Sequence, residues 1–174
     1  MSSKLDKKYT KYNHNNWNHG KNEQVFTPDE TDKKILNIVV KDARLSYREI
    51  ARQSSLAVKT VIDRIRRLEA EGVIKSYSTN LDSEKLGYTI TAVIEMIITR
   101  GLIRKKTFAE LSKYPNVFIV YEITGVSDTV IVAKFKDTRE MERFLRELQS
   151  KEFVQKTETK IVINSVKEDF RVEV

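Results

Sequence analysis

Six polar side chains between positions 59 and 67 are spaced to share the outer side of one helix, and four of them are basic. They are Lys59, Thr60, Asp63, Arg64, Arg66 and Arg67. The opposite side is aliphatic, so the stretch predicts an amphipathic helix with a buried stripe. Lysine and arginine on such a face suit phosphate oxygens, and the arginine fork also matches O6 and N7 of guanine. A solvated face held by pairs such as Asp63 with Arg67 is the alternative, and this helix alone does not decide between them.

The scarce residue types also limit the chemistry. The chain has no cysteine, its two histidines are His14 and His19, and none of its five glycines forms a nucleotide-binding loop. This composition excludes disulfides and thiolate zinc sites, and it leaves the predicted folded body without the usual general base or transition-metal ligands. We therefore expect no catalytic residue, no metal and no cofactor. A net charge of +7 with a pI near 9.5 suits a polyanionic partner.

Residues 1–26 predict a disordered basic tail. The stretch is rich in Asn, Lys and His, and five lysines against two carboxylates give it a net charge of +3. Such a composition buries too little apolar surface to offset its ordering entropy. A metal held by His14 and His19, or a base stacked on Trp17, is the sharper alternative. The chain also lacks an apolar run long enough for a membrane span and a signal-peptide core, so we expect a cytoplasmic protein.

Residues 27–79 predict three helices followed by a short strand. Two capping boxes mark helix starts. The pairs are Thr27 with Glu30, where Asp29 is an alternative cap, and Ser46 with Glu49. Gly72 suits the end of the third, basic helix, and the strand is expected at 73–78. A short capped helix, a tight turn and a longer basic helix make a helix-turn-helix, whose second helix enters the major groove of DNA.

A linker at 80–87 leads to a second predicted domain at 88–174, in which strand and helix patterns follow the order β-α-β-β-α-β. The expected strands are 88–98, 117–124, 129–135 and 157–166, and the expected helices are 103–114 and 137–151. This order favours a four-stranded antiparallel sheet with two helices on one face, the ferredoxin-like arrangement. The predicted fold class is therefore α+β, with a winged helix-turn-helix domain joined by a hinge to a ferredoxin-like βαββαβ domain.

Several stretches carry a resemblance to a known family. "DETDKKIL", "LSYREIARQSSLAVKTVIDRIRRLEAEGVIKSYS" and "LDSEKLGY" look like the N-terminal half of the Lrp/AsnC (leucine-responsive, feast/famine) regulators. "VYEITGVSD" and "TETKIVI" resemble that family's sensing domain, so the likeness runs from Pro28 to about Glu168. The resemblance implies a regulator that binds double-stranded DNA as a dimer through paired helix-turn-helix units. It also implies that the sheets form the dimer and that dimers assemble into tetramers, octamers or rings.

The chain departs from the family pattern at the turn before the basic helix. Ser55 stands where the turn usually has a glycine, and Ala57 with Val58 replaces the usual capping serine and proline. Loss of the cap costs the helix start about 1 kcal/mol, unless Ser55 serves instead.

The resemblance further implies that a small effector, typically an amino acid, binds between sensing domains of neighbouring dimers. The family's glycine and aspartate between the second and third strands fall on Gly125 and Asp128. Gly125 permits a positive φ with exposed N–H groups for a carboxylate, and Asp128 supplies the charge for an ammonium. The other candidates are Val126, Tyr121, Thr124, Thr157 and Thr159. A plain turn with ordinary strand residues is the alternative.

These observations predict a sequence-specific DNA-binding transcriptional regulator that responds to an amino-acid-like effector. Two alternatives stay open: a ligand-independent DNA-organising protein of the same fold, and an amino-acid-binding metabolic module or enzyme. The basic helix and the scarcity of His and Cys weigh against the second alternative.

Overall fold

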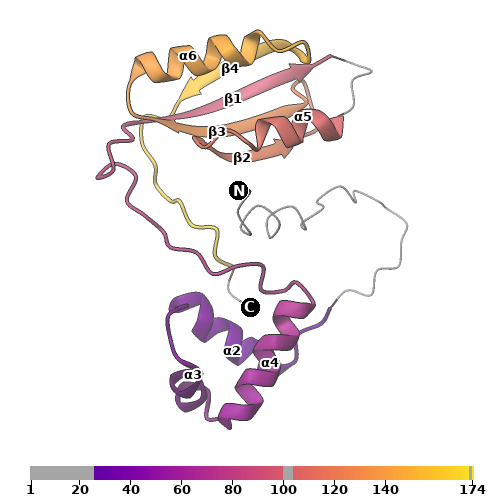
Figure 1. Cartoon of the computed structure of the whole chain (residues 1–174), viewed down its shortest axis with the longest axis vertical. Coiled ribbons are helices and arrows are strands. Elements are labelled where there is room, and N and C mark those ends of the chain that lie inside the picture. Colours follow the sequence, from indigo (N-terminus) through magenta and orange to yellow (C-terminus); the bar gives the residue numbers. More distant parts are fainter. Residues whose placement is uncertain (1–25, 100–103, 173) are drawn as a thin grey trace, which may run out of the picture. The chain divides into compact units, whose positions relative to one another are not determined.

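The computed structural model describes residues 26–99, 104–172 and 174 of the chain. Within these residues the chain forms two compact units (Figure 1). One unit holds the residues up to Asn80 together with those from Glu168 onward, and the other is Leu81–Lys167. The predicted basic tail lies outside the described residues, apart from Phe26. No described helix is long and apolar enough to cross a membrane.

Three helices build the first unit as far as it is described, and their apolar faces meet in one core. The helices are α2 (Glu30–Lys41), α3 (Tyr47–Ser54) and α4 (Val58–Ala70). The buried core residues are Ile35, Val39, Ile50, Ala51, Val61 and Ile65. The short turn between α3 and α4 completes the predicted helix-turn-helix. The strand expected at 73–78 is wrong: none of the four strands described below pairs with it, and an extended segment forms a strand only where a partner takes its hydrogen bonds.

The helix starts follow the capping pattern, with one change. The Ser46 hydroxyl accepts from Glu49 N at 3.3 Å, and the Glu49 carboxylate accepts from Ser46 N at 2.8 Å, so this predicted box is confirmed. For α2, the Thr27 cap is wrong and the alternative, Asp29, is confirmed. Asp29 accepts from Asp32 N at 2.9 Å, and Asp32 accepts from Asp29 N at 3.2 Å.

The C-terminal residues from Glu168 belong to the first unit, which the sequence pattern does not indicate. The Asn37 side-chain amide on α2 donates to Val174 O at 2.7 Å and accepts from Val174 N at 3.1 Å. One side-chain amide thus satisfies both backbone groups of Val174, as a neighbouring strand would.

The second unit is an antiparallel sheet in the order β2-β3-β1-β4, with two helices packed on one face. Its strands are β1 (Ile90–Ile98), β2 (Val117–Glu122), β3 (Thr129–Phe135) and β4 (Val154–Ile161), and its helices are α5 (Arg104–Leu111) and α6 (Thr138–Gln149). The predicted ferredoxin-like topology is confirmed. Alternate residues of β1 and β3 form a buried core with Leu111, Phe144 and Leu148 from the two helices.

The opposite face of the sheet carries the intervening side chains. Val93 on β1 lies directly across from Val132 on β3, and Glu95 lies across from Val130; these four residues and Ile97 are half-buried. The last strand begins and ends earlier than predicted. It stops at Ile161, which pairs with Ala92. Since β1 begins at Ile90, only two residues before Ala92, little of β1 remains for further pairing.

Candidate functional site

The turn before α4 lacks the glycine and the capping serine that the family pattern has there. Ser55 has a left-handed backbone (φ 57°), and it is the only non-glycine residue with positive φ among those described. That conformation is why a glycine suits this turn. The N-cap of α4 is Ala57, which makes no side-chain capping bond, so Ser55 does not replace the missing cap.

The outer side of α4 presents four of the six predicted DNA-binding residues. Lys59, Asp63 and Arg66 are exposed, and Thr60 is half-buried. Neither Lys59 nor Arg66 has an ion-pair partner within the described part of the chain. Both cations are therefore available to an external anion such as a phosphate.

The remaining two, Arg64 and Arg67, are held within the unit. Arg64 donates to Asp29 and, at 3.1 Å, to Asp32. Arg67 donates to Asp32 at 2.7 Å, and its guanidinium lies 5.1 Å from the centre of the Phe26 ring. The hydrogen bond from Arg64 lowers the pKa of Asp29, and the same bond raises the pKa of Arg64.

The acidic partners of these arginines, Asp29 and Asp32, are functional residues that the sequence pattern did not identify. Asp32 is fully buried although it is charged. A signal was available: Asp32 precedes Ile35 by three residues and Leu36 by four, which places a carboxylate on the apolar stripe of α2. A charge at such a position requires a basic partner from a neighbouring helix.

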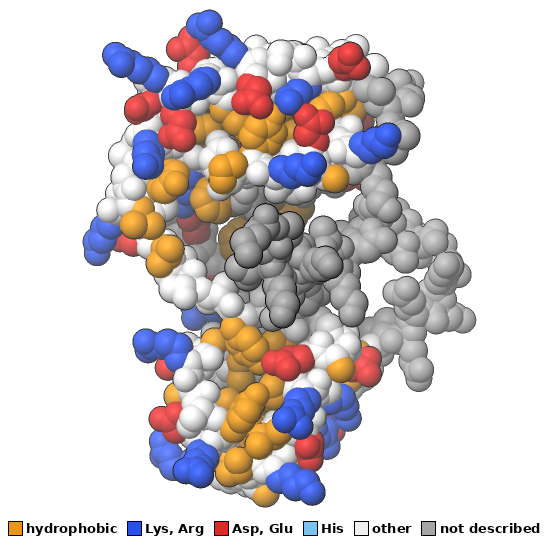
Figure 2. Space-filling view, viewed as in Figure 1, with side chains coloured by type: hydrophobic (Ala, Val, Ile, Leu, Met, Phe, Trp, Pro, Cys, Tyr) orange, Lys and Arg blue, Asp and Glu red, His pale blue; other side chains and the backbone are white. Residues whose placement is uncertain are grey.

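On the face drawn in Figure 2, charge is local rather than of one sign. On the face drawn in Figure 2, the Lys and Arg side chains are interspersed with Asp and Glu over both units. A polyanion that approached this face would therefore be recognised through particular side chains and not through a uniform field.

The predicted effector turn joins β2 to β3. Gly125 has φ 120°, which glycine tolerates, and Val126 beside it is 91% exposed. The Asp128 carboxylate accepts from Ile98 N at 2.9 Å, and Asp128 N donates to Met96 O at 2.9 Å. Asp128 thus fastens the turn to the end of β1, a structural task that the sequence did not reveal.

A second polar contact ties this turn to the sheet. Ser127 donates to Glu95 at 3.1 Å, and Lys160 on β4 pairs with the same carboxylate. The bonds from Lys160 and Ser127 lower the pKa of Glu95. The turn is therefore anchored by both Asp128 and Ser127.

The other effector candidates do not lie together in a single chain. Tyr121 lies on β2 and Thr157 and Thr159 lie on β4, which are opposite edges of the sheet. Gln149 of α6 donates to Thr157 at 2.9 Å, so Thr157 is on the helix-covered face. Tyr121 pairs with Val130, on the other face, and Thr124 is exposed in the turn. A site that used all of them would need more than one subunit.

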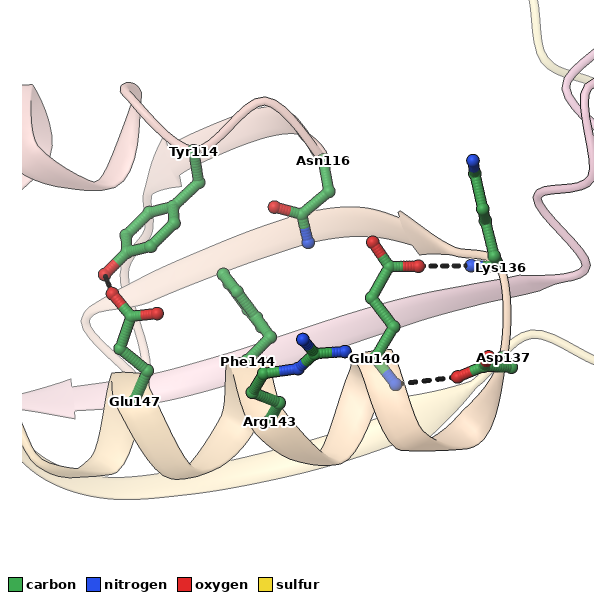
Figure 3. A pocket seen from close by; sticks show the side chains of 8 residues that line it. All are labelled: Tyr114, Asn116, Lys136, Asp137, Glu140, Arg143, Phe144 and Glu147. Atoms are coloured by element: carbon green, nitrogen blue, oxygen red, sulfur yellow. Dashed lines mark hydrogen bonds between the residues drawn. The ribbon is translucent and has the colours of Figure 1, made fainter.

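A separate pocket of about 400 Å³ lies beside α6 (Figure 3). It is lined by Tyr114, Asn116, Lys136, Asp137, Glu140, Arg143, Phe144 and Glu147. Its three carboxylates already have structural roles: Asp137 caps α6, Glu140 accepts from Lys136 N at 2.7 Å, and Glu147 accepts from the Tyr114 hydroxyl at 2.7 Å. Burial, together with the Glu147 carboxylate, raises the pKa of Tyr114. We assign no ligand to this pocket.

Comparison with known protein families matches both units. A family model described as winged helix-turn-helix DNA-binding matches residues 28–75, and one described as the Lrp/AsnC ligand binding domain matches residues 91–172. An uncharacterised HTH-type transcriptional regulator of Pyrococcus abyssi is 42% identical over 145 residues, which cover 83% of this chain and 98% of that protein. The HTH-type transcriptional regulator FL11 of Pyrococcus furiosus is 39% identical over 140 residues, covering 80% and 92%.

Solved structures are similar in fold over most of the chain. A transcriptional regulator from Neisseria meningitidis, in complex with L-Met, has a TM-score of 0.78 at 26% identity and covers 84% of this chain and 96% of its own. LrpC of B. subtilis has a TM-score of 0.74 at 26% identity, covering 83% and 100%. The chain therefore belongs to the Lrp/AsnC family of transcriptional regulators, with a DNA-binding winged helix-turn-helix domain followed by the ligand-binding domain of that family.

Proposed function

We propose that this regulator binds a specific duplex sequence through the outer side of α4. The observation that carries the proposal is the outer side of the N-terminal half of that helix, where exposed Lys59 and Asp63 and half-buried Thr60 precede exposed Arg66. In a helix-turn-helix, the N-terminal residues of the second helix meet the base edges. Lys59 and Arg66 have no ion-pair partner among the described residues, so no intramolecular pair has to break when they meet DNA.

The effector in this proposal is a small amino acid that binds at the β2–β3 turn. Gly125 lies in an exposed turn whose backbone N–H groups could meet a carboxylate, and Asp128 offers a negative charge for an ammonium. The L-Met complex of the similar Neisseria regulator supports this class of ligand. Because Tyr121 and the threonines of β4 lie on different faces of one sheet, the pocket would be completed by a neighbouring subunit.

The assembly in this proposal is a dimer built on the helix-free sheet face, with further association through the effector turns. Val93, Val130 and Val132 form an apolar strip there, and the Glu95–Lys160 ion pair lies on the same face, with Glu95 between Val93 and Ile97. Protein interfaces combine apolar contacts of this kind with hydrogen-bonded polar groups. The protein acts in the cytoplasm and catalyses no reaction; the family of regulators that it belongs to supports both statements.

The experiment that tests the function is binding selection on random duplexes with and without a pool of the twenty amino acids. We expect one enriched motif with two related half-sites, whose recovery changes when the pool is added. Recovery without any enriched motif, together with a melting temperature that no amino acid shifts, would favour the ligand-independent DNA-organising protein. Failure to retain any duplex at moderate salt would favour the metabolic module.

A further inference from the structure

The ion-pair cluster between α2 and α4 has a geometry that DNA binding alone does not explain. It joins the N-terminus of α2 to the second half of α4 across 32 and 35 residues of sequence. The Asp32 carboxylate is its centre. One oxygen accepts from Arg64, and the other accepts from Arg67 and from the backbone N–H of Asp29.

Burial makes this cluster difficult to open. The Asp32 side chain has 0% of its surface exposed, whereas the side chains of Arg64 and Arg67 are 28% and 45% exposed. A carboxylate taken out of water is tolerated only while its basic partners remain in place. If either arginine turned away to a DNA phosphate, it would leave that buried charge short of a partner.

Electrostatics at the cluster also disfavours a phosphate. The two arginines face two carboxylates, Asp29 and Asp32, so the local charges cancel. A phosphate brought to Arg64 would approach the half-exposed Asp29 as well. Arg66 lies between them in sequence and pairs with no carboxylate among the described residues. A phosphate can therefore approach Arg66 without leaving a buried charge unpaired.

We propose that Arg64 and Arg67 are positioning residues, which set the orientation of α4 against α2 through Asp32, and that Lys59 and Arg66 supply the cationic DNA contacts of this helix. This inference rests on the proposed DNA-binding function. It divides the basic residues of α4 into two pairs, one that positions the helix and one that contacts DNA.

The test compares Arg66→Ala with Arg67→Ala in the full chain, because the two arginines are adjacent and identical. Dissociation constants are measured over a salt series for the selected duplex and for a scrambled duplex of equal length, well below the melting temperature. Arg66→Ala should make the slope of log K against log salt shallower by about 0.9 if it contacts one phosphate, with no change in melting temperature.

Arg67→Ala should behave differently in each respect. Its salt slope and its affinity for the scrambled duplex should stay at the wild-type values, since no phosphate contact is lost. Its affinity for the selected duplex should fall about tenfold, because a misplaced helix loses at least one base contact. Its melting temperature should fall as well. A merely structural role would lower the melting temperature and leave the selected-duplex affinity of the folded protein unchanged, which would overturn the proposal.

Asp32→Asn gives the sharpest contrast, because the two models predict opposite signs. It keeps the shape of the side chain, removes the buried charge that holds Arg67 and one of the two carboxylates that hold Arg64, and makes the protein more positive by one charge. Positioning predicts weaker binding to the selected duplex at an unchanged salt slope. Direct DNA contact predicts tighter binding with a steeper slope, which would overturn the proposal. If Asp32→Asn does not fold, Asp29→Asn is expected to give a smaller change of the same sign.

The control separates this inference from the function on which it rests. Lys59→Ala and Arg66→Ala both leave the buried cluster intact. If neither variant alters duplex binding, the DNA-binding role of α4 is itself refuted. If they alter it and Arg67→Ala also makes the salt slope shallower at an unchanged melting temperature, the role of α4 stands and only the positioning role is refuted.

Discussion

At the scale of single residues, Ser55 adopts a backbone conformation that disfavours any side chain. Its φ of 57° lies in the left-handed region, which costs an L-residue roughly 1–2 kcal/mol. The turn nevertheless holds because α3 and α4 bury a shared core on either side of it. The position thus carries a local cost that tertiary packing offsets.

Ser55→Gly should therefore stabilise the first unit. Relief of the left-handed conformation outweighs the added backbone entropy of glycine, which is about 0.5–1 kcal/mol. The net gain should be about 0.5–1 kcal/mol, or a few degrees in the calorimetric melting temperature. Ser54→Gly is the matched control and should destabilise, because Ser54 is helical, is buried and donates to Ile50 O at 2.7 Å. A lower melting temperature for Ser55→Gly would contradict the strain argument.

Asp128 combines a structural bond with a proposed charge contact, and two substitutions separate them. Asp128→Asn keeps an oxygen that accepts from Ile98 N, so the melting temperature should stay near that of the wild type. Its affinity for the best amino-acid effector should fall tenfold to a hundredfold in calorimetric titration, about 1.5–3 kcal/mol for a lost charge-assisted bond.

Asp128→Ala removes both contacts and should lower the melting temperature as well as the effector affinity. Equal effector affinity in the wild type and both variants would show that Asp128 only anchors the turn. The pocket would then have to be sought elsewhere on the sheet.

At the scale of elements, α4 differs from its neighbours in having no side-chain cap. The helices α2, α3 and α6 each begin with a capping Asp or Ser, whereas α4 begins after Ala57. The helix is stabilised instead by the burial of Val61, Ile65 and Leu68 and by the ion pairs to α2. Tertiary contact thus replaces the local signal that starts the other helices.

Ala57→Ser should supply the missing cap. The Ala57 backbone is already extended (φ −67°, ψ 142°), as an N-cap requires, so the hydroxyl can accept from a free N–H of the first turn. The first unit should gain about 1 kcal/mol in chemical denaturation. Ala70→Ser, at the other end of the same helix, is the control and should give no gain. No change with Ala57→Ser would mean that the first turn of α4 does not limit stability.

At the scale of the whole molecule, the two faces of the sheet have different tasks. One face is buried under α5 and α6 within the chain. The other presents an apolar strip that a single chain leaves half-exposed, and the proposed dimer covers it. A regulator that reads two half-sites depends on that contact, because the dimer sets the spacing of its two recognition helices.

Val132→Lys should convert the dimer to a monomer. Val132 lies in the apolar strip, directly across from Val93, and an ammonium buried there would have to compete with Lys160 for the Glu95 carboxylate. The dimer dissociation constant should rise at least about a hundredfold, measured by sedimentation equilibrium. Ala109→Lys, on the exposed side of α5, should leave the dimer unchanged. An undisturbed dimer in Val132→Lys would place the interface elsewhere.

Local patterns determined much of the fold from the sequence. The capping box at Ser46 and Glu49 places its partners three residues apart, so the start of α3 can be read without any tertiary contact. The alternation in β1 and the β-α-β-β-α-β order likewise identify the sheet, because side chains alternate between faces with a period of two. The expectation of a basic second helix in a helix-turn-helix rested on the same kind of local periodicity.

Only the tertiary structure decided which basic side chains of α4 remain available to contact DNA. Asp32 and Arg67 are 35 residues apart in sequence. Helix periodicity places Arg64 and Arg67 near the polar side of α4, but it does not identify the carboxylate with which they pair. The same holds for Asp128, whose bond to Ile98 N crosses 30 residues, and for Tyr121 and Thr157, which a strand pattern cannot assign to opposite edges of a sheet. Pairing across the chain depends on how the elements pack, and that information is carried by the core as a whole and not by any one segment.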